Sequence, residues 1–441
     1  MKKWKRFRQS SWPFLREEFG LNLEKLKKGK RMTKKFLCVF FVFCFYSVVA
    51  FGGIQDWSQW RGPQRDGTAR NFPVLAKWPA TLRTIWSIEV GAGHSSPVIL
   101  DEIVYLFSRE AENEIVRAID LKTGKILWRT GYIAPYKEYP GAVEHGKGPK
   151  STPVVYAGKL FTLGISGILS CFSVSNGKLL WQRNFSGRFP ANHPPFGTSM
   201  SPLIEDGMLI VHAGGHQGGA VLALDPDQGV EKWSLEGEGP SYSSPIVVTL
   251  EKQKQIVIQV HRKILGVNLN DGKILWSIPF VTPCDQNIVT PVLAGDILIF
   301  SSLDKGTFGV RLHRERETWR PEILWDTKEI SLYMSSPVLF KNRLIGFSHK
   351  RQGEFFALEP FTGKILWRSG ARVAENAALI IAGSDILILK EDAELFVLPA
   401  SADSFQPVAT YQVAKSATWA HPVPTNQGIL IKDALSLSLL R

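Results

Sequence analysis

The strongest constraint on this chain is a segment that repeats along most of its length. Each copy runs from a small residue to a tryptophan ten positions later, with a glycine four positions before the tryptophan. Five copies are clear: AIDLKTGKILW (118–128), CFSVSNGKLLW (171–181), ALDPDQGVEKW (223–233), GVNLNDGKILW (266–276) and ALEPFTGKILW (357–367). Because glycine supplies the positive φ of a tight turn, each copy predicts two strands joined by a hairpin.

A second repeated segment carries a proline after Ser or Thr in most copies. Its copies are SSPVI (95–99), STPVV (151–155), MSPLI (200–204), SSPIV (243–247), VTPVL (289–293), SSPVL (335–339), the degenerate NAALI (376–380) and AHPVP (420–424). An alternating apolar run with a turn follows each copy, so one unit contains four short strands. Four-stranded units of this length are typical of propeller blades.

The two ends of the repeat array complete each other. The segment around Trp86 is a last strand without a blade, and the chain ends after a first strand at Pro422 with no last strand of its own. We therefore predict an all-β, eight-bladed β-propeller with four-stranded blades. Its ring is closed by pairing residues 82–89 with residues 418–441.

The aromatic residue that ends each blade is predicted to dock on the neighbouring blade beside a small residue, where its ring buries about 150–250 Å². Cys171 stands at a small-residue position, so we expect it to pack as a free thiol, and we expect no disulfide with Cys284. The docking residues are Trp86, Trp128, Trp181, Trp233, Trp276, Trp325, Trp367 and Tyr411.

The positive charge of the chain is concentrated at its N-terminus. Residues 1–35 hold 13 Lys/Arg and 3 Asp/Glu, whereas the remainder holds 40 and 37, so the body has no electrostatic footprint for nucleic acid. The apolar run 36–49, between lysines and small residues, predicts an export signal that is cleaved, or an uncleaved inner-membrane anchor over 36–54. We expect an exported, periplasmic protein, and the start at Met1 or Met32 stays open.

These features divide the chain into four parts: a basic leader (1–31), the signal or anchor (32–52), an N-terminal lead-in segment (53–80) and the propeller (81–441). The repeat resembles the tryptophan-docked, BamB-like propellers of the pyrroloquinoline-quinone (PQQ) repeat superfamily. The lead-in motif W-x-x-W-R-G-P-x-R-D-G, with Trp57, Trp60, Arg61 and Arg65, is similar to that of exported bacterial proteins in this group.

The resemblance implies two kinds of function. Large PQQ dehydrogenases hold the quinone against a disulfide of two adjacent cysteines, with Ca²⁺ nearby, whereas BamB-type propellers assist outer-membrane protein assembly. This chain has no adjacent cysteine pair, so the sequence requires no cofactor, and PQQ with Ca²⁺ stays an alternative that such a pair does not support. We favour a non-catalytic ligand- or protein-binding scaffold of the cell envelope, with a PQQ-dependent dehydrogenase of alcohols or sugars as the alternative.

The loops that precede the innermost strands should open on one axial mouth of the ring. We expect a small ligand or an envelope protein to bind there, on a monomeric propeller; we assign no catalytic residue and no metal site. The proposed mouth residues are His94, His145, Lys147, Lys150, Arg188, His193, Tyr242, Asp285, Asn287, Tyr333, Glu375 and His421.

Overall fold

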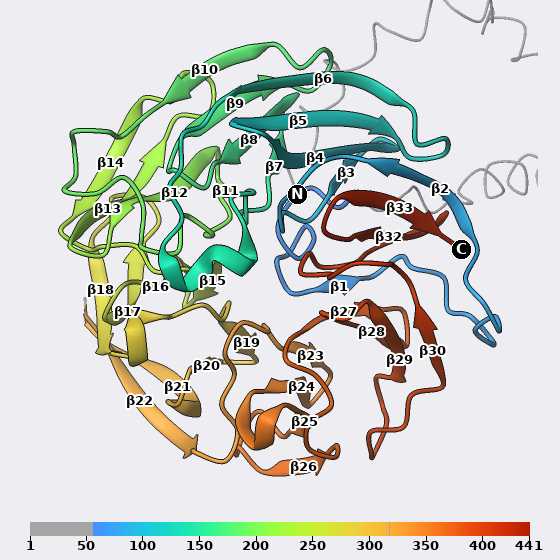
Figure 1. Ribbon diagram of the computed structural model, residues 1–441. Coiled ribbons are helices and arrows are strands. Elements are labelled where there is room, and N and C mark those ends of the chain that lie inside the picture. Colours follow the sequence, from blue (N-terminus) through green and yellow to red (C-terminus); the bar gives the residue numbers. More distant parts are fainter. Residues whose placement is uncertain (1–55, 317) are drawn as a thin grey trace, which may run out of the picture. The chain divides into compact units, whose positions relative to one another are not determined.

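The structure is a computed structural model that describes residues 56–316 and 318–441. The leader and the export signal or anchor therefore lie outside the described residues. Eight sheets surround a central axis in chain order, as Figure 1 shows, and this confirms the predicted eight-bladed propeller.

The first four blades each contain four consecutive antiparallel strands. Blade 1 contains β3 (Val98–Leu100), β4 (Ile103–Glu110), β5 (Asn113–Asp120) and β6 (Ile126–Ile133); blade 2 contains β7 (Val154–Tyr156), β8 (Lys159–Leu163), β9 (Leu169–Ser173) and β10 (Leu179–Arg183). Blade 3 contains β11 (Leu203–Glu205), β12 (Met208–Gly215), β13 (Gly218–Leu224) and β14 (Glu231–Glu236); blade 4 contains β15 (Ile246–Leu250), β16 (Gln253–Gln259), β17 (Lys263–Asn268) and β18 (Ile274–Pro279).

The remaining blades include two that recruit strands from the N-terminal side of the chain. Blade 5 contains β19 (Val292–Ala294), β20 (Ile297–Ser302), β21 (Gly306–Glu315) and β22 (Thr318–Thr327); blade 6 contains β23 (Val338–Phe340), β24 (Arg343–Ser348), β25 (Glu354–Leu358) and β26 (Ile365–Arg368). Blade 7 contains β27 (Ala377–Ala382), β28 (Asp385–Lys390), β29 (Glu394–Pro399), β30 (Ala409–Gln412) and the added β1 (Thr68–Ala69); blade 8 contains β31 (Val423–Thr425), β32 (Gly428–Lys432), β33 (Ser436–Leu440) and β2 (Thr84–Glu89). Short 3-10 helices lie in loops: η2 (Pro140–His145), η3 (Pro283–Asp285) and η4 (Lys350–Gln352).

Ring closure occurs where the sequence places it. Strand β2 pairs antiparallel with β33, from Thr84 opposite Leu440 to Glu89 opposite Ser436. The outermost strand of blade 8 therefore comes from the start of the propeller and its three inner strands from the end, as predicted. In Figure 1 the C-terminus lies beside β2.

Six of the docking tryptophans join their blade to the next one by the same bond. The indole N–H donates to a backbone carbonyl just after the third strand of the following blade. The acceptors are Leu121 for Trp86 (2.8 Å), Val174 for Trp128 (2.9 Å), Pro226 for Trp181 (3.2 Å), Leu269 for Trp233 (3.0 Å), Pro360 for Trp325 (3.0 Å) and Ala402 for Trp367 (2.9 Å).

The turn glycine has a packing role besides its conformational one. Gly177 has φ +71, and a Cβ added there would lie 2.5 Å from a ring carbon of Trp128 in the preceding blade. In blades 1 to 6 a small residue lies directly opposite the tryptophan, as Cys171 does for Trp181, whereas Leu395 lies opposite Tyr411 in blade 7 and Leu439 opposite Trp86 in blade 8. Cys171 is a buried free thiol, as expected, and burial raises its pKa to about 12.

Two blade ends depart from the rule. Blade 5 replaces the short glycine turn with the long hairpin β21–β22, so Trp276 of blade 4 donates instead to Gln255 of its own blade (2.8 Å). Trp319 of that hairpin donates back to Gln253 of blade 4 (2.9 Å). At blade 7, the hydroxyl of Tyr411 donates to the carbonyl of Pro79 in the lead-in segment (2.6 Å).

The lead-in segment enters the centre of the ring, where the blue trace lies in Figure 1. Trp57 exchanges two 2.9 Å backbone hydrogen bonds with Ile99 of blade 1, and the carbonyl of Ser58 accepts one from Val155 of blade 2 (2.8 Å). Strand β1 adds in parallel to β27 of blade 7. The segment therefore behaves as part of the propeller core.

Two buried arginines of this segment bind carbonyls at the inner ends of three blades. Their side chains form no ion pair within the described part of the chain, and burial lowers the pKa of Arg61 to about 10 and that of Arg65 to about 9. Both remain charged at neutral pH. The contacts are Arg65 with Ser201 (3.1 Å), Pro202 (2.9 Å) and Pro245 (2.9 Å), and Arg61 with Pro337 (2.5 Å).

Trp60 completes the set of contacts. Its indole N–H donates to the hydroxyl of Thr290 in blade 5 (3.0 Å), and its ring lies 4.5 Å from that of His421 in blade 8. With Trp57, Ser58, Arg61, Arg65 and β1, the lead-in segment contacts all eight blades.

The Ser-Pro segments also connect neighbouring blades around the axis. The backbone N–H of the residue before the proline donates to the corresponding side-chain hydroxyl of the next blade. These bonds run from Ser96 to Thr152 (3.1 Å), Thr152 to Ser201 (2.9 Å), Ser201 to Ser244 (3.0 Å), Thr290 to Ser336 (3.0 Å) and His421 to Ser96 (2.9 Å).

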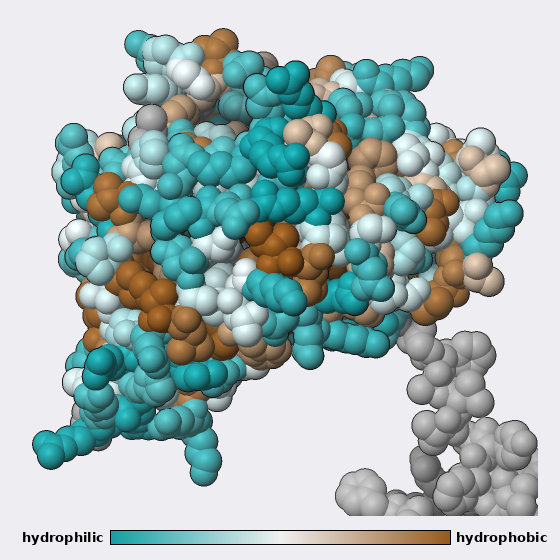
Figure 2. Space-filling model, turned by 90° about the horizontal axis from the view of Figure 1, so that it is seen from below, coloured by the Kyte–Doolittle hydropathy of each residue, from teal (hydrophilic) through white to brown (hydrophobic). Residues whose placement is uncertain are grey.

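The outer surface of the propeller is mixed in character. The side seen in Figure 2 carries hydrophobic patches interrupted by hydrophilic ones. Several last strands begin with exposed apolar side chains, such as Leu127 and Leu180. Within residues 56–316 and 318–441, no helix is long and apolar enough to span a bilayer.

Replacing Trp181 with alanine tests the docking bond. The change removes the ring that packs on the blade 3 turn at Gly229, so the free energy of unfolding should fall by about 3–5 kcal/mol. Leu180→Ala, in the same strand with a 44% exposed side chain, is the control and should change it by less than about 0.5 kcal/mol. Urea titration measures both; equal midpoints for the two variants would contradict the docking role.

Replacing Arg65 with alanine tests the central insertion. The variant loses the bonds to Ser201, Pro202 and Pro245, so its free energy of unfolding should fall by at least about 3 kcal/mol. Arg70→Ala is the control, because its ion pair with Asp66 is exposed and should contribute at most about 1 kcal/mol. Thermal unfolding compares them, and a loss for Arg65→Ala no larger than that for Arg70→Ala would refute the proposed role.

Candidate functional site

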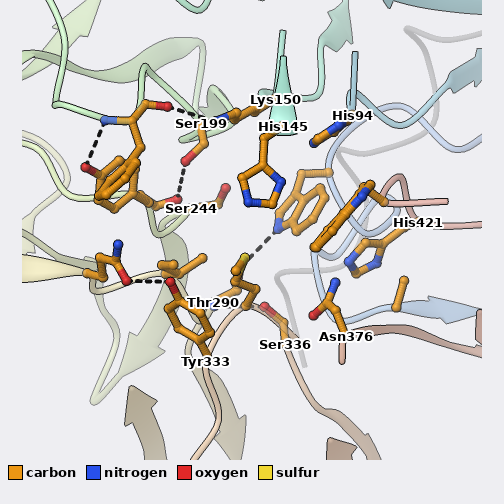
Figure 3. Close-up of a pocket in the computed structure, with 18 of the residues that line it drawn as sticks. His94, His145, Lys150, Ser199, Ser244, Thr290, Tyr333, Ser336, Asn376 and His421 are labelled. Atoms are coloured by element: carbon orange, nitrogen blue, oxygen red, sulfur yellow. Dashed lines mark hydrogen bonds between the residues drawn. The ribbon is translucent and has the colours of Figure 1, made fainter. Parts of the chain in front are cut away.

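The axial mouth contains a cavity of about 280 Å³ at the end of the ring where the innermost strands begin. Its walls come from the loops that the sequence places there: between β2 and β3, around η2, and before β11, β15, β19, β23, β27 and β31. Trp60 of the lead-in segment also lines it. Figure 3 shows the labelled side chains pointing from these loops into one shared space.

Aromatic rings form one side of the cavity. The ring of Trp419, before β31, stacks on His94 with a centroid distance of 5.7 Å and an interplanar angle of 16°. His145, at the end of η2, meets the same tryptophan edge to face at 4.9 Å. Across the loops, Phe196 packs against Tyr242 at 5.8 Å. The arrangement suits a flat, apolar body between aromatic surfaces.

The histidines of the cavity are neutral at physiological pH. Burial, assisted by the nearby charge of Lys150, lowers the pKa of His94 to about 3. Burial and then the charge of Arg61 lower the pKa of His421 to about 3, and burial with Lys150 lowers that of His145. Nδ1 of His421 is buried and has no hydrogen-bond partner among the described residues, so it can still accept or donate.

Lys150 supplies the positive charge of the cavity wall. Its ammonium donates to the carbonyl of Phe196 (2.9 Å), and burial lowers its pKa to about 8. Lys150 is therefore largely charged at pH 7, with two further N–H donors for a ligand. Among the described residues, no Asp or Glu side chain lines the cavity. An anionic group therefore meets attraction and no opposing carboxylate.

Six of the twelve mouth residues proposed from the sequence line this cavity. They are His94, His145, Lys150, Tyr242, Tyr333 and His421.

The other six do not line this cavity: five of them make other contacts, and one is exposed to solvent. Lys147 pairs with Glu138 (3.8 Å), Arg188 pairs with Glu231 and Glu236 at the outer strand, and the ring of His193 packs on Tyr136. Glu375 is exposed to solvent. Asn287 is buried and its amide donates to the carbonyls of Val260 and Phe280, and Asp285 faces His261.

Sequence reasoning missed Phe196 and Gln286, in the loops before β11 and β19, and two further groups of lining residues. The sequence showed Trp60 only as part of the lead-in motif. The periodicity of the strands does not indicate that this motif enters the centre of the ring. The residues of the second group lie in or next to the Ser-Pro segments, and the repeated position of these segments could have identified them. They are Ser199, Ser244, Thr290, Ser336, Asn376 and Trp419.

A second cluster lies at the rim beside Tyr242. His216 follows β12, His261 follows β16, and Asp285 ends η3, so a loop of blade 3, a loop of blade 4 and the connection to blade 5 bring one side chain each. The imidazole rings stack with centroids 4.3 Å apart, and Nε2 of His261 lies 2.8 Å from a carboxylate oxygen of Asp285. The sequence assigned no role to either histidine.

Comparison with known families agrees with this architecture. A family profile described as "Outer membrane protein assembly factor BamB" matches residues 112–369, which is more than half of the chain. This chain belongs to the BamB-type family of PQQ-like β-propeller repeat proteins. The resemblance inferred from the tryptophan repeat is thereby confirmed.

Relatives of this BamB-type propeller are distant in sequence. The outer membrane protein assembly factor BamB of Yersinia pestis is 21% identical over 370 residues, covering 79% of this chain and 86% of that protein. The BamB of Moranella endobia (strain PCIT) is 23% identical over 192 residues, 43% of each chain, so the match spans less than half of that relative. A tetrathionate hydrolase of Acidithiobacillus ferrooxidans is 19% identical over 347 residues, 69% of this chain and 65% of that enzyme.

Solved structures share the fold of this BamB-type propeller. BamB from Moraxella catarrhalis superposes with a TM-score of 0.59 at 16% identity, covering 82% of this chain and 98% of that one. Quinohemoprotein alcohol dehydrogenase from Comamonas testosteroni gives a TM-score of 0.64 at 13% identity, covering 88% and 80%. A BamB protein and an alcohol dehydrogenase therefore share this fold, so the fold alone does not assign a function to the chain.

The quinoprotein fold neighbours raise the question of PQQ with Ca²⁺. Ca²⁺ takes about six to eight oxygen ligands, usually with carboxylates among them. The described cavity lining offers hydroxyls and the amides of Gln286 and Asn376 but no carboxylate. The residues of this BamB-type propeller therefore do not fit a PQQ–Ca²⁺ centre, and we derive no reaction through one.

Proposed function

We propose that this chain is a non-catalytic binding and scaffold module of the cell envelope that captures an anionic group in its axial cavity. The observation that carries the proposal is the charge of the cavity wall, where Lys150 faces aromatic and neutral polar groups with no lining carboxylate among the described residues. The BamB relatives, named as outer membrane protein assembly factors, support the scaffold role.

The chemistry of the wall defines what should bind. The ammonium of Lys150 and the ring nitrogen of His421 can hold a carboxylate or similar anion, and the rings of Trp419 and Phe196 can cover a flat apolar part. Such a group can belong to a small ligand or to an acidic side chain presented by an envelope protein. A small ligand and an acidic side chain would contact the same cavity wall, so substitutions in this wall should weaken the binding of both.

Two measurements on protein purified from the native cell envelope distinguish a small ligand from a protein partner. Native mass spectrometry of the wild type detects a small ligand that co-purifies. A photo-crosslinking residue at Tyr139, which is 49% exposed and contacts Phe196, detects a protein partner. The same residue at Leu180 on the outer edge is the matched control.

Lys150→Gln should remove the co-purified ligand or the crosslink at position 139, because it removes the positive charge of the cavity wall. Lys147→Gln is the control, since Lys147 lies outside the cavity and pairs with Glu138. Retention of ligand and crosslink in Lys150→Gln, or equal loss in both variants, would contradict the proposal.

Calorimetric titration with PQQ, an aromatic tricarboxylate, distinguishes the quinoprotein alternative. Any binding should be independent of Ca²⁺ and should weaken as the pH rises from 7 to 9. Lys150, with a pKa of about 8, loses its charge over that range, so the attraction present below pH 8 is lost above it. Tight binding that requires Ca²⁺ would instead favour the dehydrogenase.

A further inference from the structure

The cluster of His216, His261 and Asp285 is separate from the cavity wall and is not used by the proposed function. One ligand atom from each residue lies within 4.8 Å of the corresponding atoms of the other two. A tetrahedral ion with bonds near 2.0–2.1 Å holds its ligand atoms about 3.3 Å apart, so modest side-chain rotation closes the set. The three residues are all partly buried, at the rim of the mouth.

The donor atoms of the cluster are available. Nε2 of His216 is buried and has no hydrogen-bond partner in the described part of the chain. Burial, with the neighbouring His261 adding to it, lowers the pKa of His216 to about 4, so the ring is neutral at pH 7 and can offer a lone pair. Nε2 of His261 and the carboxylate of Asp285 already face each other at 2.8 Å.

We propose that His216, His261 and Asp285 form a binding site for a divalent transition-metal ion such as Zn²⁺. Imidazole nitrogen and carboxylate oxygen are the ligand types that Zn²⁺ takes, and three protein ligands leave one position for water or a further ligand. Ca²⁺ and Mg²⁺ prefer all-oxygen ligand sets, so the two histidines select against them.

The surroundings of the cluster tolerate a cation. The nearby positive group is Arg262, whose Nε lies 3.5 Å from a carboxylate oxygen of Asp285. Its side chain is 61% exposed, so it can turn into solvent when an ion takes its place. The ring of Tyr242 packs edge to face on His216 at 5.6 Å and covers one side of the cluster.

The position of the site gives the ion a structural consequence. His216 belongs to blade 3, His261 to blade 4, and Asp285 to the loop that leads into blade 5. A bound ion would therefore connect these three loops at the rim. It would also stiffen the wall of the cavity, because Tyr242 and Gln286 line that cavity and adjoin these residues.

Zn²⁺ titration of the metal-free chain, purified without a polyhistidine tag, tests the site. We expect one equivalent to bind in competition with a chromophoric chelator, and the melting temperature to rise with Zn²⁺. His216→Ala and His261→Ala should each weaken binding at least about tenfold, and the double variant should lose the rise in melting temperature. Co²⁺ in place of Zn²⁺ should give the visible absorption of a four-coordinate ion.

A matched control exists within the chain. His349 lies 3.0 Å from Asp304 in a similar His–Asp pair, but only Lys350 completes that group, so His349→Ala should leave Zn²⁺ affinity unchanged. Circular dichroism of the metal-free variants checks that they fold, and His216→Asn serves if the alanine variant does not. Wild-type affinity no higher than that of the double variant, or an equal loss in His349→Ala, would overturn the proposal.

Discussion

The structure depends on the insertion of the lead-in segment into the centre of the ring. A propeller of eight blades leaves an axial channel lined by the ends of innermost strands, whose backbone carbonyls need donors. Arg65 and Arg61 bring guanidinium groups to those carbonyls without any partner carboxylate among the described residues. Trp60 of the same segment donates a hydrogen bond to Thr290 and lines the cavity.

This insertion also explains the electrostatics of the mouth. Two buried guanidinium groups and Lys150 place positive charge along the axis, and the same burial keeps the histidines of the cavity neutral. A carboxylate brought to this wall is attracted by the ammonium of Lys150. Capture of an anion is the role we propose for this cavity, whose described lining contains Lys150 and no carboxylate that could act as a calcium ligand.

The blades could be predicted from the sequence because the contacts within and between them are local or repeat at a regular interval. The Trp–Gly spacing predicted that the rings dock on the neighbouring blade, although not the hydrogen bonds that they donate there, and the unmatched copies at Trp86 and Pro422 predicted ring closure. Half of the proposed mouth residues line the cavity for the same reason, since the loop positions follow from the strand order. Trp276 differs because the next blade lacks the glycine turn, a feature visible in the irregular spacing before Trp325.

Other features of the site could not be predicted from periodicity. The lead-in segment makes its contacts with residues up to several hundred positions away, and no repeat encodes them. His216 and His261 lie at equivalent corners of consecutive blades, but their meeting with Asp285 depends on the angle between blades and the conformation of η3. Only the folded ring brings these three loops together.

Differential scanning calorimetry of the whole chain tests the central claim most directly. If the lead-in segment and the β2–β33 pairing couple all eight blades, the propeller should unfold in one transition, with the van't Hoff enthalpy equal to the calorimetric enthalpy. Two or more resolved transitions, with blades 7 and 8 melting before the others, would contradict this coupling. The remaining blades would then stay folded without the ring closure and without the contacts of the lead-in segment to all eight blades.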